Sequence, residues 1–186
     1  MPPHPPAPTL PAARPSAILA ADAAGYARLM AVDERLAVEL LDAARAVLRD
    51  ACTEHQGRVV DMAGDSVLLA FASAASALRC ALLVQQRLVA QANPQTGTLR
   101  LPFRIGVHLG EVTEKADGSV YGDGVDIAVR LQALAEPDEV LVSQSMTSRS
   151  TVPYMAPWRR SDMERDWRDP KSRDSCADND AKSEGA

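Results

Sequence analysis

The order of strand-like and helix-like segments predicts an α+β fold, in which helices cover one face of a mainly antiparallel sheet. Two observations carry this prediction. Short apolar runs alternate with long segments whose apolar residues recur every three or four positions, in the order β-α-β-β-α-β followed by α-β. In addition, the apolar runs at 57–61 and 66–71 stand so close together that they must form a hairpin.

The first half of the chain supplies the opening strand and helix of this order. The apolar run 16–22 is predicted to be a buried strand that ends in the carboxylate of Asp22. A helix is predicted over 33–55 because its leucines, alanines and valine recur at helical spacing, and Asp33 can cap its N-terminus.

The second half follows the hairpin with a helix over 74–91, which Ser73 can cap. A glycine-rich loop then leads to a helix over 125–135, and EVLVS at 139–143 is predicted to be the last strand. Between the two helices, the strict alternation of 99–109 predicts a strand with one buried face and, on its polar face, Arg100, Arg104 and His108.

Composition limits the class of protein. The length of 186 residues suits one domain, and a hydrophobic fraction of 46% is enough for a core. A net charge of −5 and a pI of about 5.2 argue against nucleic acid or an anionic membrane as partner. No apolar run is long enough to span a bilayer, no secretory signal is evident, and the three cysteines are widely spaced. These features are typical of a cytoplasmic protein with reduced thiols.

The two ends of the chain differ in composition from the middle. Residues 1–15 hold seven of the 13 prolines and are predicted to be a disordered leader. Residues 151–186 are polar and lack periodicity, and they are predicted to be a disordered tail. The folded domain is therefore predicted at 16–150.

Two carboxylates are candidates for a metal site. Asp22 ends a predicted strand and Asp65 lies in the hairpin turn. Because a β-α-β-β order usually places the first strand beside the hairpin, the two are expected at one edge of the sheet, which suits two divalent ions about 3.5–4 Å apart. The alternatives are a helix cap for Asp22 and ordinary turn chemistry for Asp65. The candidate phosphate contacts are the backbone N–H groups of Ala23, Ala24, Gly25 and Tyr26.

The segment GSVYGDGVDIAVRLQ at 118–132 is the third candidate. Its glycines allow the backbone to approach a ligand closely, and Asp126 and Arg130 lie four residues apart on one face of the following helix. One interpretation is a surface salt bridge that contributes about 0.2–0.5 kcal/mol. The other is that Arg130 contacts a phosphate.

Five segments together resemble the class III adenylate/guanylate cyclase catalytic domain. They occur in the family's order and spacing, as ILAADAAGYARLM at 18–30, GRVVDMAGDSVLLAF at 57–71, FRIGVHLGEV at 103–112, YGDGVDIAVRLQALAEP at 121–137 and VLVS at 140–143. The resemblance implies a ferredoxin-like β-α-β-β-α-β core that pairs head-to-tail, as a homodimer or with another cyclase domain. The implied reaction converts a purine nucleoside triphosphate, ATP rather than GTP, to a 3′,5′-cyclic nucleotide and pyrophosphate for intracellular signalling.

The resemblance also assigns roles by position. Asp22 and Asp65 match the family's two metal aspartates and would hold two Mg²⁺ or Mn²⁺ ions, with the carbonyl of Ala23 as an extra ligand. Arg130 matches the arginine that stabilises charge developing on the α-phosphate, and it would act from the opposite subunit.

The chain departs from the family pattern at three further positions and at its C-terminal end. Asp61 stands where the family usually keeps a lysine that reads the purine, and Ser119 replaces its aspartate or threonine partner. Asp126 replaces the asparagine that orients the ribose. The family's C-terminal helix, strands and lysine have no counterpart in 151–186, so this part is predicted to be missing or divergent. The alternative function is a catalytically impaired dimerisation module that supplies metal aspartates to a partner domain.

Overall fold

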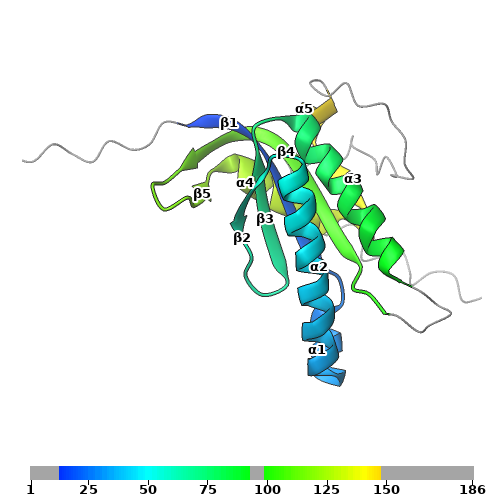
Figure 1. Ribbon diagram of the computed structural model, residues 1–186. Helices are drawn as coiled ribbons and strands as arrows, with labels where there is room; N and C mark the ends of the chain where they lie inside the picture. The colour runs from blue at the N-terminus through cyan, green and yellow to red at the C-terminus, as the bar shows by residue number, and fades with distance from the viewer. Residues whose placement is uncertain (1–12, 93–98, 148–186) are drawn as a thin grey trace, which may run out of the picture. The chain divides into compact units, whose positions relative to one another are not determined.

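A computed structural model of the chain describes residues 13–92 and 99–147, and they form an α+β fold, as predicted (Figure 1). Most of the predicted leader and the whole predicted tail at 151–186 lie outside the described residues. The elements are β1 (Arg14–Ala23), α1 (Tyr26–Val32), α2 (Glu34–Glu54), β2 (Arg58–Asp61), β3 (Ser66–Phe71), α3 (Ala74–Gln91), β4 (Phe103–Glu114), β5 (Val120–Tyr121), α4 (Asp123–Leu134), β6 (Val140–Val142) and α5 (Gln144–Thr147).

The sheet has the strand order β2-β3-β1-β4-β5, and β6 pairs with β4 in parallel. The strand β1 runs antiparallel to both β3 and β4. The ferredoxin-like order is therefore confirmed, and β1 lies beside the hairpin as the sequence predicts. The two capping predictions are also confirmed, because the Asp33 carboxylate accepts from Leu36 N at 2.9 Å and the Ser73 hydroxyl accepts from Ser76 N at 3.0 Å.

The starts of two strands differ from the prediction by more than one residue. β1 begins at Arg14 instead of Ser16, and it accommodates Pro15 because that stretch pairs with β4 alone, so the missing N–H is not needed on the other side. β4 begins at Phe103 instead of Leu99, because its pairing with β1 stops at the pair of Phe103 with Ala23. Leu99 is 58% exposed.

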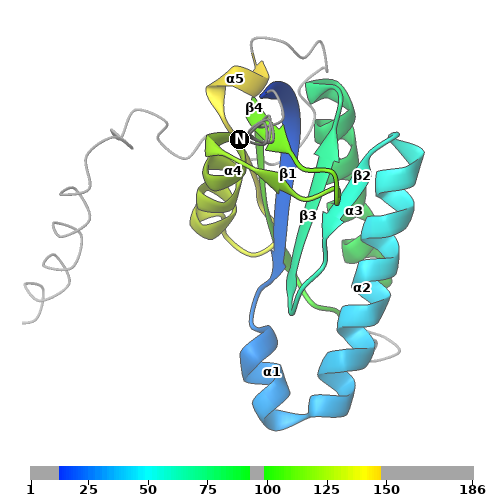
Figure 2. The ribbon, with the colours of Figure 1, turned by 90° about the vertical axis from the view of Figure 1, so that its left-hand side faces the viewer.

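Helices cover both faces of the sheet, which corrects the prediction that they lie on one. Figure 2 shows α2 and α3 on one side of β1 and β3, and α4 on the other. The position of α4 follows from its connection, since a helix that joins the parallel strands β4 and β6 must cross over a face of the sheet. The helix α4 can approach β4 closely because residue 106 is a glycine. A Cβ at this position would lie only 2.3 Å from the Ala128 carbonyl oxygen of α4.

The hydrophobic core therefore has two parts, one on each face of the sheet. Ile18 and Ala20 of β1 pack in the same cluster as Ala128 of α4, while the alternate residues of β1 face α2 and α3. Between α2 and α3 lie Cys52 and Cys80, both buried and free. Burial raises the pKa of the Cys80 thiol to about 12 and also raises that of Cys52, so both remain protonated.

His108 is buried rather than exposed on a polar face. Its Nδ1 lies 2.8 Å from the Ser143 hydroxyl, and Ser145 Oγ in turn donates to the Leu109 carbonyl at 2.9 Å. These bonds tie β4 to the end of β6 and the start of α5. Burial lowers the pKa of His108, which fits a structural imidazole kept neutral. In the described part of the chain, no helix has the length and hydropathy needed to cross a bilayer.

Candidate active site

The first group of candidate residues lies where β1 ends. Asp22 is the penultimate residue of β1 and pairs in register with Ser66, the first residue of β3. Asp65 precedes Ser66, and its carbonyl accepts a hydrogen bond from Ala23 N at 3.2 Å. The structure thus brings Asp22 and Asp65 to the same edge of the sheet on neighbouring chain segments. It does so because Asp65 immediately precedes β3, whose first residue pairs with Asp22.

An arginine already binds one of these carboxylates. Arg104 of β4 stands opposite Asp22 in register, and it donates from Nε to Oδ1 at 2.9 Å and from Nη2 to Oδ2 at 2.5 Å. The Asp22 side chain is only 15% exposed. The hydrogen bond with Asp22 raises the pKa of Arg104, and the negative charges of Asp22 and Asp65 add to the effect. We call Asp22, Asp65 and Arg104 the carboxylate edge.

The residue types at the carboxylate edge fit a divalent cation. Within the described ranges no group of three or more His, Cys, Asp or Glu side chains could hold a metal. Mg²⁺, however, is commonly bound by one or two carboxylates, with water and substrate phosphates completing its shell. The Arg104 guanidinium shows that positive charge is accommodated against Asp22. Each carboxylate offers about four lone-pair sites, so Asp22 can bind a cation and still accept from Arg104.

The backbone N–H groups after Asp22 are only partly available to a ligand. Ala23 N donates to Asp65, and Ala24 N donates to the Pro102 carbonyl at 2.8 Å. The fold therefore uses the amide of Ala24, which the sequence offered as a phosphate contact. Gly25 adopts a left-handed conformation with φ of 80° before α1, and no bond from the N–H of Gly25 or Tyr26 is found among the described residues.

Asp61 lines a cavity on the α4 side of the sheet. It is the last residue of β2 and is exposed. The cavity has a volume of about 180 Å³, and its walls are Ala20, Ala21, Asp61, Ser66, Val67, Leu68, Val129 and Gln132. These walls come from β1, β2, β3 and α4, so the position of Asp61 is open to a ligand held between the sheet and α4.

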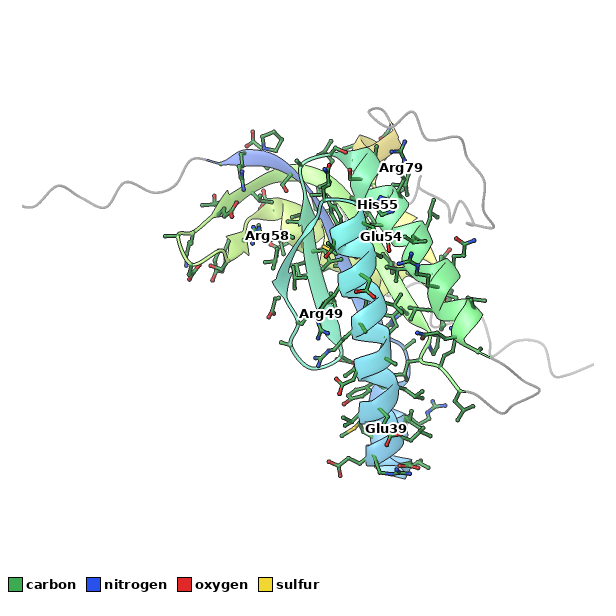
Figure 3. All side chains as sticks on the ribbon, viewed as in Figure 1. Glu39, Arg49, Glu54, His55, Arg58 and Arg79 are labelled. Carbon is green, nitrogen blue, oxygen red and sulfur yellow. The ribbon has the colours of Figure 1, made fainter. Side chains whose placement is uncertain are left out.

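Ser119 is held within its own loop. Its hydroxyl and its N–H both donate to Asp117 Oδ1, at 2.5 and 2.9 Å, and these bonds lower the pKa of Asp117. Arg58 of β2 anchors the same loop by donating to the Gly118 carbonyl at 2.7 Å, and Figure 3 shows Arg58 on the side of β5. Asp61 lies three residues beyond Arg58 on β2, and three residues of a strand span about 10 Å.

Asp126 and Arg130 are exposed on the outer face of α4. Neither forms an ion pair or hydrogen bond with any residue that the structure describes, so the predicted surface salt bridge is absent there. Leu134 lies on the same helical stripe and is 65% exposed, and Val129, which also lines the cavity, flanks this stripe and is 44% exposed. We call Asp126, Val129, Arg130 and Leu134 the α4 outer face.

Arg104 is the residue of this site that sequence reasoning missed. The alternation of β4 placed it on a polar face without giving it a partner. The signal that identifies it is the antiparallel register of β1 and β4, which sets Arg104 opposite Asp22. A sequence pattern predicts that two strands pair but does not fix which residues face each other.

Known proteins resemble this chain in sequence and in structure. The family model described as the adenylate and guanylate cyclase catalytic domain matches residues 12–165. "Putative adenylate cyclase 3" of Rhizobium meliloti (strain 1021) is 42% identical over 134 residues, which cover 72% of this chain and 23% of the relative. An adenylate cyclase of Streptomyces coelicolor is 35% identical over 124 residues, which cover 66% of this chain and 30% of the relative. The chain thus spans less than a third of the length of either relative.

Solved structures agree. The crystal structure titled adenylate/guanylate cyclase/hydrolase from Silicibacter pomeroyi matches with a TM-score of 0.66 and 36% identity, over 74% of this chain and 80% of that one. The guanylyl cyclase Cya2 matches with a TM-score of 0.68 at 23% identity, over 75% of this chain and 80% of that one, which supports the fold alone.

Proposed function

Because the chain belongs to the family of adenylate and guanylate cyclase catalytic domains, we propose that it cyclises a purine nucleoside triphosphate. The products are a 3′,5′-cyclic nucleotide and pyrophosphate, and the proposed setting is signalling in the cytoplasm. The observation that carries the proposal is the carboxylate edge, where Asp22 at the end of β1 lies beside the chain segment of Asp65, the turn residue that precedes β3.

Asp22 and Asp65 are proposed to hold two Mg²⁺ or Mn²⁺ ions together with the Ala23 carbonyl. When bound, such ions activate the ribose 3′-hydroxyl and neutralise the charge of the triphosphate. Arg104 fixes the direction of the two Asp22 oxygens through the paired hydrogen bonds. Gly25 and Tyr26 have N–H groups that can meet phosphate oxygens beside this edge.

Arg130 is proposed to stabilise negative charge on the α-phosphate from the opposite subunit. Its support is the α4 outer face, where Arg130 is exposed, has no partner among the described residues, and stands beside the exposed Val129 and Leu134. Apolar side chains next to an unpaired guanidinium suit a surface that a second chain covers. The proposed assembly is a homodimer or a heterodimer with another cyclase domain.

The base is proposed to lie in the cavity beside Asp61, and Ser119 is proposed as its second contact. ATP is the proposed substrate in preference to GTP, in line with the names of both sequence relatives. For Ser119 to donate to a purine, its hydroxyl must turn away from Asp117.

A second candidate function is a catalytically impaired module that supplies Asp22 and Asp65 to a partner domain. The observation that favours it is Asp126, whose carboxylate no described residue neutralises. Two like charges 4 Å apart repel by about 4 kcal/mol at an effective dielectric near 20, so an ionised Asp126 close to a triphosphate would slow the reaction.

The test of the proposed function is an assay of the purified chain with Mn²⁺ and either ATP or GTP. We expect formation of a cyclic nucleotide that an Asp65→Ala variant does not support. If the two proteins give the same signal, the chain alone is not a cyclase. Activity that arises only on mixing with an intact cyclase domain would favour the second candidate.

A further inference from the structure

Arg45 of α2 reaches the turn that leads into the carboxylate edge. Its Nη2 donates a hydrogen bond to the Gly64 carbonyl and lies 3.5 Å from the Met62 carbonyl oxygen. The side chain is only 19% exposed, whereas that of Arg35 on the same helix is 84% exposed. Arg45 is therefore turned inward, whereas Glu39 of the same helix, labelled in Figure 3, has a side chain that is 57% exposed.

An ion pair does not explain why Arg45 is turned inward. Asp42 Oδ1 is 3.8 Å from Nη1, and the Asp42 side chain is 67% exposed, so their attraction is weak. Nε of Arg45 is buried and has no hydrogen-bond partner among the described residues. A buried donor without a partner costs free energy. The contacts that offset this cost are those with the two carbonyls of the turn.

The turn in question fixes the main chain of Asp65. Gly64 has a left-handed φ of 56°, and Ser66 N donates to the Ala63 carbonyl at 3.0 Å to close the turn. On the opposite side, the Asp65 carbonyl accepts from Ala23 of β1. Asp65 is thus held between β1 and the guanidinium of Arg45.

We propose that Arg45 is a positioning residue, which sets the distance and direction of the Asp65 carboxylate relative to Asp22 by fixing the turn at 62–64. The inference rests on the proposed function, because it assigns Arg45 to the same metal site. Precision at such a site matters, since a displacement of about 1 Å in a catalytic group can slow a reaction about 100-fold. Without the Arg45 contact, the carbonyls of the turn would bind only water, and the turn could shift by such a distance.

The experiment compares Arg45→Met with the wild-type chain in two measurements. The first is a titration with Mn²⁺ alone, in which electron paramagnetic resonance detects the bound ion. The second is hydrogen exchange of the backbone amides at 63–66. We expect about tenfold weaker Mn²⁺ binding, the low end for loss of a group that orients a metal ligand, and faster exchange in the turn. Arg45→Lys should recover part of the affinity, because its ammonium group can donate to one of the two carbonyls. The matched control is Arg49→Met, which removes an exposed arginine one turn further along α2 and should change neither quantity.

The outcomes separate the two proposals. If Asp65→Ala binds Mn²⁺ as the wild type does, the metal site is wrong and the role of Arg45 falls with it. If Asp65→Ala abolishes binding but Arg45→Met keeps wild-type affinity and exchange, only the role of Arg45 is overturned. A lower melting temperature of Arg45→Met with unchanged affinity has the same meaning, because a merely structural arginine would produce it. If Arg45→Met does not fold, Arg45→Lys and Arg45→Gln are judged by the same criteria.

Discussion

The carboxylate edge and the α4 outer face are the two parts of the proposed active site, and they differ in how their charges are held. At the edge, Asp22 is largely buried and Arg104 donates to both of its oxygens. On α4, Asp126 and Arg130 are exposed and have no ion pair within the part of the chain that the structure describes. The edge is built on interior strands, whereas the outer face projects from a helix that covers the sheet (Figure 2).

This difference indicates where one chain is complete and where it is not. Groups that already have partners keep their geometry before any ligand arrives. Asp126 and Arg130 are exposed and do not pair with each other, so their positions are fixed only when another surface covers them. We therefore infer that the edge is preorganised within the chain and that α4 depends on a second chain.

The largest effect is expected from placing one defect in each region. Asp65→Ala and Arg130→Ala should each lower cyclase activity at least about 100-fold, because each removes a group that stabilises charge in the transition state. A mixture of the two variants should regain activity, since a dimer of one of each retains one intact site. With random pairing, half of the dimers carry one good site of two, so the recovery should approach roughly a quarter of wild type.

The control for this measurement is a mixture of Asp22→Ala with Asp65→Ala, which alters the same half of the site in both chains and should stay inactive. No recovery in the first mixture would place both halves of the site within a single chain, whereas recovery in the control would mean that Asp22 and Asp65 of one site come from different chains.

A smaller effect is expected from disturbing the seat of α4. Gly106→Ala adds a Cβ that would lie only 2.3 Å from the Ala128 carbonyl oxygen and 2.3 Å from Gln132 N. Backbone atoms cannot rotate aside, so α4 must shift, and overpacking of this kind costs about 1–3 kcal/mol. Chemical denaturation should show this loss while Mn²⁺ binding at the carboxylate edge remains. Unchanged stability would mean that α4 is not seated as the structure shows.

The contrast between the regions also predicts unequal costs for two arginines. Arg104→Met leaves the Asp22 carboxylate without its partner, and we expect a loss of about 1 kcal/mol, reduced because a third of Arg104 is exposed. Arg130→Met should change stability by less than about 0.5 kcal/mol, as surface substitutions do. Urea unfolding of the two variants measures these losses of stability. Equal losses would contradict the difference between a paired arginine at the carboxylate edge and an unpaired one on α4.

The smallest effect concerns pH. Because burial lowers the pKa of His108 in the folded chain, the unfolded chain takes up a proton first as pH falls through its ordinary pKa near 6.5. His108 should therefore cost no stability above that pH and lower stability as the solution is acidified toward 5.5. His108→Gln should flatten this part of the curve of melting temperature against pH. His55→Gln, at the end of α2 and outside the hydrogen bonds of His108, should leave it unchanged.

The sequence predicts the elements better than the contacts between them. Helical spacing and the caps at Asp33 and Ser73 locate α2 and α3 within one residue at most of their ends, because both signals are local. The proximity of Asp22 and Asp65 also follows from topology alone. The pairing of Asp22 with Arg104 does not, since strand register depends on the whole sheet. Nor does the inward turn of Arg45, because a long side chain on a helix has several rotamers and only the packed hairpin selects one.

The contact at Gly106 has a consequence for how such a domain can change over time. Because α4 rests on β4 through main-chain atoms, its seat does not depend on which side chains it presents outward. If this face binds a second chain, as proposed, substitutions at Val129 or Leu134 alter which chain is accepted without moving the helix itself. One glycine in the sheet thus leaves the choice of partner free to diverge among descendants while the architecture is inherited unchanged.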